Sequence, residues 1–311
     1  MEVNNGEANA KMEAELVPDW TELTWECLID IFSRLGMEQR WNAPMLVCKT
    51  WRDVCNDPLL NLVFDLETWF LTSTETCNRW SFEFSKNIDS MLMSVVERSK
   101  GCLKEIRVRH CTDESLSYVA DSLKNRVKKK KILDQIVYGW VKFLICPHLE
   151  VLWVNHCPNV TDRSMEKIAL KCPKIMELDI SCSYALSSRC MEMFGKNCKN
   201  LQIIKQNFTA LSEVSRFESL ENYVENLPII PIGNVDSHGI GCHMQQLKQL
   251  ELRFLTVTDK ALANICKRCP KLEYLDLFGC QNLTRYGVIK STSTLKNLKE
   301  IKKPKFRALF F

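Results

Sequence analysis

The sequence predicts an α/β chain that begins with a small helical domain and continues as a short solenoid of parallel strands and helices. Apolar motifs recur through the second part, and those that begin at Leu149, Ile175 and Leu201 lie 26 residues apart, a period typical of solenoid repeats. Residues 18–65 have a different composition, rich in Trp and Leu, and lack that period. A composition of 46% hydrophobic and 26% charged residues indicates a globular chain rather than a disordered one.

Residues 1–17 are predicted to form a disordered tail, because they are rich in Asn, Glu and Ala. They lack the positive start and apolar stretch of a secretory signal. We therefore expect a protein of the nucleus, the cytoplasm or both, and not a secreted one. No apolar run approaches the roughly 18 residues that cross a bilayer, so no membrane span is expected.

The helical domain is predicted to span residues 18–65. Thr24 can cap a first helix that ends at Gly36, and Pro44 can begin a second. Their apolar positions follow helical spacing: Leu28, Ile31, Phe32 and Leu35 in the first, and Met45, Leu46, Val47 and Trp51 in the second. A domain this small is near the limit of independent stability, so much of this apolar surface is expected to pack on a partner.

The solenoid is predicted to span residues 101–303, after a linker and N-terminal cap at 66–100 and before a tail at 304–311. Each unit begins with a strand whose alternate residues point inward, such as Leu152 and Val154. A helix follows, with Thr161 or Thr258 as its N-cap. Stacked units place parallel strands on the concave face and helices outside. Seven units are predicted to begin at Leu103, Leu149, Ile175, Leu201, Leu247, Leu272 and Leu298.

Two gaps between unit starts predict insertions, at about 122–145 and 208–244. The first has four consecutive lysines, Lys128 to Lys131, before an apolar helical pattern. Several interpretations of this segment stay open: a solvated insertion, a nuclear-import signal, a membrane-surface or partner-binding helix, or a gene-model or splicing artefact. The second is rich in Pro and Gly and is predicted to be a long loop with a role in recognition. A truncated array also stays open, since no polar capping repeat closes it.

The sixteen cysteines are expected to be reduced thiols, since no secretory signal takes the chain to an oxidising compartment. Cys146, Cys172 and Cys198 recur every 26 residues, which indicates a repeat position. The pair Cys266 and Cys269 has the C-x-x-C spacing of a zinc site. Because both already occupy repeat positions, we expect neither a metal nor a cofactor.

The motif L-x-x-L-x-L-x-x-C, followed by Thr-Asp, a helix and Cys-Pro, resembles the cysteine-containing subclass of leucine-rich repeats. Three blocks near the amino terminus resemble the F-box: Cys27 to Leu35, Val47 to Arg52, and Asp57 to Leu59. Over nearly its whole length the chain is similar to plant F-box and leucine-rich-repeat proteins of the Skp-interacting type. In that family the F-box docks on a Skp-type adaptor, which sits on a cullin with a RING protein.

The resemblance implies a set of residues that face the adaptor. Carried over by position, they are Leu23, Leu28, Ile31, Phe32, Leu35, Val47, Cys48 and Trp51. In this sequence Thr24 follows Leu23 where many F-boxes have proline, which keeps a helix start but loses a rigid residue. Residues between the inward strand positions are candidates to bind an unknown protein substrate: Trp153, Asn155, Asp179, Arg253, Asp276 and Phe278.

The expected function is that of the substrate-recognition subunit of a Skp-cullin-F-box (SCF) ubiquitin ligase, without catalysis of its own. No G-x-S-x-G, P-loop or H-E-x-x-H motif supports an enzyme. A net charge of +4 on 311 residues argues against general nucleic-acid binding. The alternative is a leucine-rich-repeat scaffold that acts outside a ubiquitin ligase.

Overall fold

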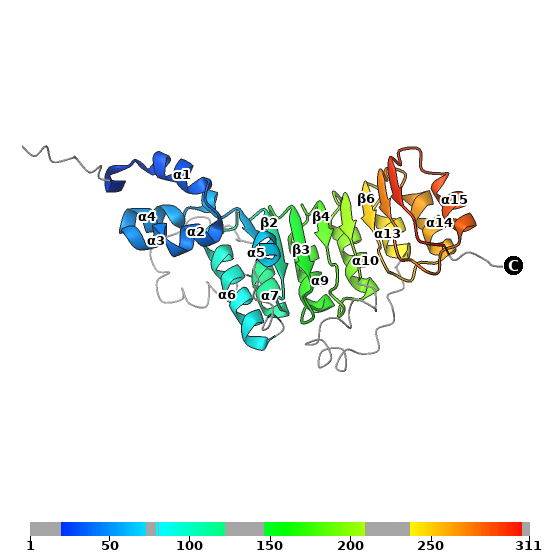
Figure 1. Ribbon diagram of the computed structural model, residues 1–311, viewed down its shortest axis with the longest axis horizontal. Helices are drawn as coiled ribbons and strands as arrows, with labels where there is room; N and C mark the ends of the chain where they lie inside the picture. Colours follow the sequence, from blue (N-terminus) through cyan, green and yellow to red (C-terminus); the bar gives the residue numbers. More distant parts are fainter. Residues whose placement is uncertain (1–19, 73–78, 80, 122–145, 209–236, 307–311) are drawn as a thin grey trace, which may run out of the picture. The chain divides into compact units, whose positions relative to one another are not determined.

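A computed structural model describes residues 20–72, 79, 81–121, 146–208 and 237–306 (Figure 1). The chain forms two compact units, Met1–Asn56 and Asp57–Phe311, which are described separately below. The predicted tail at 1–17, the insertion at about 122–145, most of the loop at 208–244 and the end of the tail at 304–311 lie outside the described residues.

The first unit is helical throughout its described part. Its elements are η1 (Trp20–Glu22), α1 (Trp25–Ser33), α2 (Met37–Asn42), α3 (Pro44–Val47) and α4 (Lys49–Cys55). Leu28 and Phe32 of α1 are buried, as are Val54 and Cys55 of α4, so the core lies between these two helices. The sequence predicted two helices here, and the described part of the unit has four α-helices besides the 3₁₀ helix η1.

Local chemistry explains where these helices begin and end. The Thr24 hydroxyl accepts a hydrogen bond from the Cys27 amide at 3.4 Å, which confirms the predicted cap of α1. Gly36 does not simply end α1; its amide donates to Gln39 Oε1 at 2.9 Å and so begins α2. Extended backbone at Cys48 (φ −153°, ψ 174°) breaks the predicted second helix into α3 and α4.

The second unit is built on one parallel sheet of eight strands in chain order. The strands are β1 (Val63–Asp65), β2 (Glu105–Arg109), β3 (Val151–Asn155), β4 (Glu177–Asp179), β5 (Ile203–Lys205), β6 (Gln249–Glu251), β7 (Tyr274–Asp276) and β8 (Glu300–Lys302). Strands β2 to β8 begin two residues after the seven predicted unit starts. The α/β fold class predicted from the sequence is confirmed.

One row of apolar residues runs across the sheet in register. Phe64 pairs with Ile106, Ile106 with Leu152, and the row continues through Leu178, Ile204, Leu250 and Leu275 to Ile301. From Phe64 to Leu275 these side chains are fully buried. The inward-pointing residues of one strand are buried only if the neighbouring repeat has an apolar residue at the same position. This requirement fixes the register of the strands.

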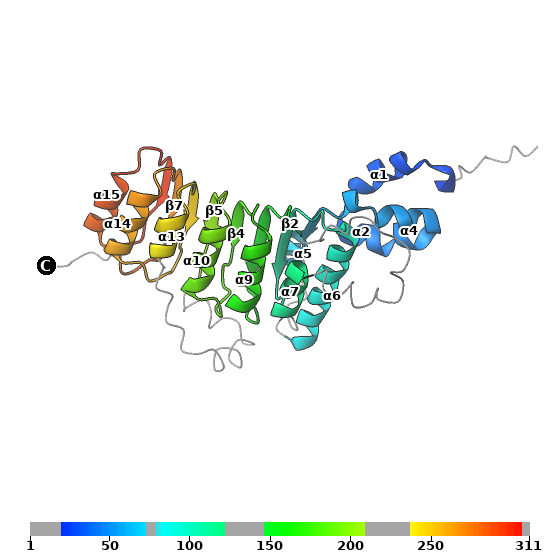
Figure 2. The same ribbon diagram turned by 180° about the vertical axis from the view of Figure 1, so that it is seen from behind.

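Helices cover one side of this sheet, as the opposite views of Figures 1 and 2 show. They are η2 (Pro58–Leu60), α6 (Phe82–Ser99), α7 (Asp113–Asp121), α9 (Asp162–Lys171), α10 (Ser188–Asn197), α13 (Ser237–His243), α14 (Asp259–Arg268) and α15 (Arg285–Thr292). Helix α5 (Glu67–Thr72) lies on the opposite side of the sheet, where Glu67 pairs with Arg109 of β2 (Figure 1). From α6 onward each helix packs against the next one along the chain. In the ranges that the structure describes, no helix combines the length and hydropathy needed to cross a bilayer.

The turn after each of five strands contains a residue in the left-handed region. These residues are His110, His156, Cys182, Phe254 and Gly279, with φ between 50° and 79°. Gly279 has an additional constraint, because a Cβ there would lie 2.3 Å from the Phe254 ring. The repeat therefore imposes the same backbone geometry on unlike residues.

Three segments contain elements that were not expected from the sequence. The helical domain was expected to reach residue 65, but Val63–Asp65 is β1, whose residues pair with β2 of the solenoid. The region 66–100 was expected to be a linker and cap, and it contains α5 and the long helix α6. The last part of the predicted loop at 208–244 is also helical, as α13.

Candidate functional site

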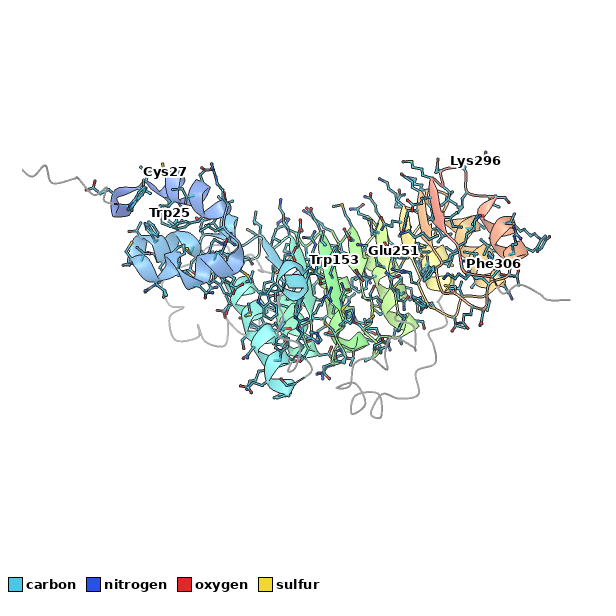
Figure 3. All side chains as sticks on the ribbon, in the orientation of Figure 1. Trp25, Cys27, Trp153, Glu251, Lys296 and Phe306 are labelled. Carbon is cyan, nitrogen blue, oxygen red and sulfur yellow. The ribbon has the colours of Figure 1, made fainter. Side chains whose placement is uncertain are left out.

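The first unit exposes an unusual amount of apolar surface for its size. Trp20, Trp25, Ile31, Leu46 and Val47 are 59%, 42%, 42%, 73% and 54% exposed. Figure 3 shows Trp25 and the exposed Cys27 near the start of α1. Large apolar side chains in contact with water favour association with another protein surface.

The predicted adaptor-facing residues divide by burial. Ile31 and Val47 are exposed, whereas Leu28 and Phe32 lie in the core of the unit. The other four, Leu23, Leu35, Cys48 and Trp51, are half-buried. Trp20, Trp25 and Leu46 are exposed but were not among the predicted adaptor-facing residues. The available signal was their place beside the predicted helix starts.

Several of these residues also hold the unit together. The Phe32 and Trp51 rings meet edge to face at 5.2 Å, which joins α1 to α4. Cys48 Sγ accepts a hydrogen bond from the Trp51 amide at 3.5 Å and caps α4. Buried Arg40 donates to the Leu35 carbonyl oxygen at 3.0 Å, so α2 holds the chain that leaves α1. These contacts fix the helices that carry the exposed side chains.

The second candidate surface is the strand face, which we define as the side of the sheet away from helices α6 to α15. At its centre, in Figure 3, Trp153 of β3 lies between two cations. The Arg107 guanidinium carbon is 4.8 Å from the indole centroid, and Lys205 Nζ is 4.3 Å from it. The indole N–H donates to Glu177 Oε1 at 2.9 Å, and Lys205 lies 3.0 Å from the same oxygen. This network orients Trp153 before any partner arrives.

A second group lies where β6 and β7 end. The Arg253 guanidinium is 5.4 Å from the Phe278 ring centroid, and its Nε is 3.8 Å from Asp276 Oδ2. Lys302 Nζ of β8 approaches the same carboxylate oxygen at 3.9 Å. Arg253 is exposed and Phe278 half-buried, so a cation and an aromatic ring are presented together.

The remaining predicted substrate residues are buried. Asn155 and Asp179 are 7% and 6% exposed, with Asn155 Nδ2 3.4 Å from Asp179 Oδ2. Burial raises the pKa of Asp179, although a hydrogen bond from Ser181 partly opposes this. Asp276 is 1% exposed and accepts from the Phe278 amide at 2.9 Å. These three residues organise the strand face, while Trp153, Arg253 and Phe278 reach solvent.

Sequence reasoning missed the partners of both groups on the strand face. Arg107 and Lys205 occupy the same strand position as Trp153, Arg107 on the neighbouring strand and Lys205 two strands away, and Lys302 pairs with Asp276. The repeat alignment contained this signal, because residues at one repeat position become neighbours. The alignment did not show in which direction each side chain points, and this information was also needed to identify the partners.

The C-x-x-C pair lies inside the second unit. Burial raises the pKa of Cys266 and of Cys269 to about 12, which keeps both thiols protonated near neutral pH. Cys269 Sγ donates to the Met244 carbonyl oxygen at 3.6 Å. Among the residues with described positions, no three of His, Cys, Asp or Glu form a cluster that could hold a metal ion.

Comparison with known proteins places these features in one class, that of an F-box module joined to leucine-rich repeats. The F-box-like family matches residues 26–61. F-box/LRR-repeat protein 19 of Arabidopsis thaliana is 48% identical over 98% of this chain and 94% of its own length. F-box protein SKIP1 of the same plant is 43% identical over 92% of this chain and 87% of its own length.

The chain therefore belongs to the family of plant F-box/LRR-repeat proteins, and the predicted resemblance is confirmed. Among solved structures, a chain of the yeast Rad7 and Elc1 complex is similar to this one. The match covers 83% of this chain and 70% of that chain, with 18% identity. The TM-score of 0.31 is too low for that likeness to carry an argument.

Proposed function

We propose that this protein is the substrate-recognition subunit of an SCF-type ubiquitin ligase. The first unit would bind a Skp-type adaptor and, through it, a cullin and a RING protein, while the strand face would bind a target protein. The chain itself would perform no chemistry. The observation that carries the proposal is the exposed apolar surface within the segment that matches the F-box-like family, and the Skp-interacting name of one relative supports it.

The exposed side chains would contribute part of the free energy of a complex with the adaptor. Full burial of a large apolar side chain contributes roughly 1.5–3 kcal/mol. Ile31, Leu46 and Val47 would together contribute several kcal/mol, from which about 4–15 kcal/mol of association cost is subtracted. The aromatic surfaces of Trp20 and Trp25 would contribute further, so the docking requires several of these residues at once.

The mechanism that follows is one of proximity. The strand face and the first unit belong to one chain, so this chain would hold the target and the adaptor together. The target's lysines would then reach a high effective concentration near the ubiquitin-loaded enzyme. Trp153, Arg253 and Phe278 are the proposed contacts, because they are the predicted substrate residues that reach solvent. Arg107 and Lys205 would position Trp153.

Co-purification of the full chain with a purified Skp-type adaptor tests the adaptor step. Ile31→Asp and Val47→Asp place a charge on exposed positions, and each should weaken adaptor binding at least tenfold, because a buried unpaired carboxylate is costly. Leu170→Asp is the matched control: Leu170 is 57% exposed on α9 of the second unit, and its substitution should leave binding unchanged.

The fold of the first unit needs a separate check. Leu28 is fully buried, so Leu28→Asp should unfold the unit and lose adaptor binding for that reason alone. Ile31→Asp and Val47→Asp should instead keep the far-UV circular dichroism of the wild type. A folded wild-type chain that does not bind the adaptor would refute the proposal and leave the scaffold alternative.

A further inference from the structure

One edge of the second unit gathers lysines that neither proposed surface uses. The helices run back along the sheet, so the connections from a helix end to the next strand start all lie at the edge where the strands begin. Backbone hydrogen bonds link these connections directly: the Lys248 amide donates to the Gln202 carbonyl oxygen at 2.8 Å, and the Glu273 amide donates to that of Lys248 at 2.7 Å. We name this the entry edge, made of residues 172–176, 198–202, 244–248, 269–273 and 293–299.

The charge of the entry edge is strongly one-sided. Its ionisable cations are Lys174, Lys199, Lys248, Lys271, Lys296 and Lys299, and all six are exposed. Within these residues the carboxylates are limited to Glu273, and the equivalent connection that enters β3, residues 146–150, adds Glu150. Lys296, labelled in Figure 3, lies on the connection that enters β8. The helix ends that lead into this edge add Lys171, Lys196, Lys267 and Arg268, also exposed.

The bonds of these lysines leave most of the charge uncompensated. Lys299 pairs with Glu273, and this hydrogen bond, with the charge of Lys299, lowers the pKa of that carboxylate. Other bonds go to neutral groups: Lys271 Nζ lies 2.6 Å from Gln246 Oε1, and Lys199 Nζ 3.2 Å from the Gly195 carbonyl oxygen. A lysine in the last turn of a helix is explained by the helix dipole. Lys199 is explained in the same way, because it binds the last turn of α10. The other five lysines lie three to seven residues beyond the nearest helix end, so the dipole does not account for them.

The ligand chemistry follows from what surrounds the cations. A surface of one sign attracts a partner of the opposite sign. Phosphate groups are held by Arg and Lys side chains together with backbone N–H groups and helix N-termini. The entry edge instead presents the carbonyl ends of α9, α10, α14 and α15, and its sequence has no aromatic residue on which a base could stack. An acidic polypeptide, whose carboxylates can meet flexible lysine side chains one at a time, fits this arrangement better than a nucleic acid.

We propose that the entry edge is a third interaction surface, which binds an acidic polypeptide segment of a partner protein. It is separate from the adaptor surface and from the strand face. Its charges repeat at the spacing of the solenoid, so an extended chain rich in Asp and Glu would contact several repeats together. Binding should weaken with added salt, because exposed charges are screened over about 10 Å at 0.1 M.

Fluorescence anisotropy with the full chain and a labelled Asp- and Glu-rich peptide tests this, in the absence of any adaptor. The double substitution Lys248→Glu with Lys271→Glu should weaken binding about tenfold, and Lys248→Gln with Lys271→Gln about threefold. Arg163→Glu with Lys260→Glu is the matched control. Both of those cations are exposed near helix starts, at the opposite edge, and their reversal should change the affinity less than twofold.

Three results would overturn the inference. The wild-type chain could fail to bind the peptide at low salt. The control pair could lose as much affinity as the entry-edge pair, which would indicate attraction to net charge alone. Duplex DNA, measured in parallel, could bind more tightly than the peptide with the same dependence on Lys248 and Lys271, which would make the edge a nucleic-acid surface.

Discussion

Buried thiols recur at the turns before β3, β4, β5 and β7 and connect one repeat to the next. Cys198 Sγ donates to the Cys172 carbonyl oxygen at 3.6 Å, and Cys269 makes the equivalent bond to Met244. Cys280 Sγ donates to the Leu252 carbonyl oxygen at 2.9 Å. A small, weakly polar side chain satisfies a carbonyl group and fills the turn without a void. This explains why the repeat uses cysteine at these positions.

These thiols predict a loss of stability at alkaline pH. Burial raises the pKa of Cys146, Cys198, Cys266, Cys269 and Cys280 from about 9 to about 12. The unfolded chain therefore loses these protons first, so the free energy of unfolding is greatest below pH about 9 and falls as pH rises toward about 12. Urea denaturation across that range should show the decline.

A second arm of the same experiment isolates the thiols. Cys198→Ala with Cys280→Ala removes two titrating groups, so the slope of unfolding free energy against pH should become shallower, even though the variant is less stable at neutral pH. A slope that the substitutions leave unchanged would mean that other groups, such as lysine or tyrosine, cause the decline.

Histidine acts at the opposite end of the pH scale. Burial lowers the pKa of His110 to about 3 and of His156 to about 4, and the nearby charge of Arg109 adds to both shifts. In the unfolded chain these groups titrate near 6.5. The folded state therefore loses stability as pH falls from about 6.5 toward about 4, because the unfolded state binds the protons first. His156→Gln should reduce that loss.

At the scale of elements, an aspartate at the start of one helix holds the start of the next. Asp113 accepts hydrogen bonds from the Thr161 amide at 2.8 Å and hydroxyl at 2.6 Å. Asp259 binds Thr284 in the same way, at 3.0 and 2.6 Å. The Thr-Asp pattern predicted only the N-caps from the sequence. The bridge could not be predicted, because it depends on how closely consecutive helix starts approach each other.

The bridge between α14 and α15 makes a sharp prediction about glycine. A Cβ at Gly287 would lie 2.0 Å from the Asp259 carboxyl carbon, so Gly287→Ala should displace that carboxylate and its bonds to Thr284. Asp259→Ala should cost about 1–2 kcal/mol through loss of the bridge. Gly287→Ala should cost about as much or more, through the clash.

The double variant distinguishes this account from simple additivity. In Asp259→Ala with Gly287→Ala the obstacle and the displaced group are both gone, so the loss of unfolding free energy should be clearly less than the sum of the two single losses. Chemical denaturation of the three variants measures it. Additive losses would contradict the proposed contact between these residues.

At the scale of the whole molecule, the repeat period predicted where the strands lie, but the sequence did not predict which apolar side chains are exposed. All seven unit starts lead into strands, because a stack of repeats leaves one register that buries every apolar position. Strand β1 was missed because Asn61 stands two residues before it, where each of the seven predicted units begins with Leu or Ile. In the first unit, apolar spacing found residues of α1 but could not separate core Leu28 from exposed Ile31, since that depends on four short helices and the break at Cys48.

The most direct test of the central claim is a parallel affinity purification of three full-length chains from cells with the proteasome inhibited. They are the wild type, Ile31→Asp with Val47→Asp, and Arg253→Glu with Phe278→Ala. The account predicts that the first variant loses adaptor and cullin but retains the proteins that the wild type captures through its strand face. The second variant should retain adaptor and cullin and lose those proteins. Adaptor retained by the first variant, or loss of both groups from either folded variant, would contradict a division of binding between the two units.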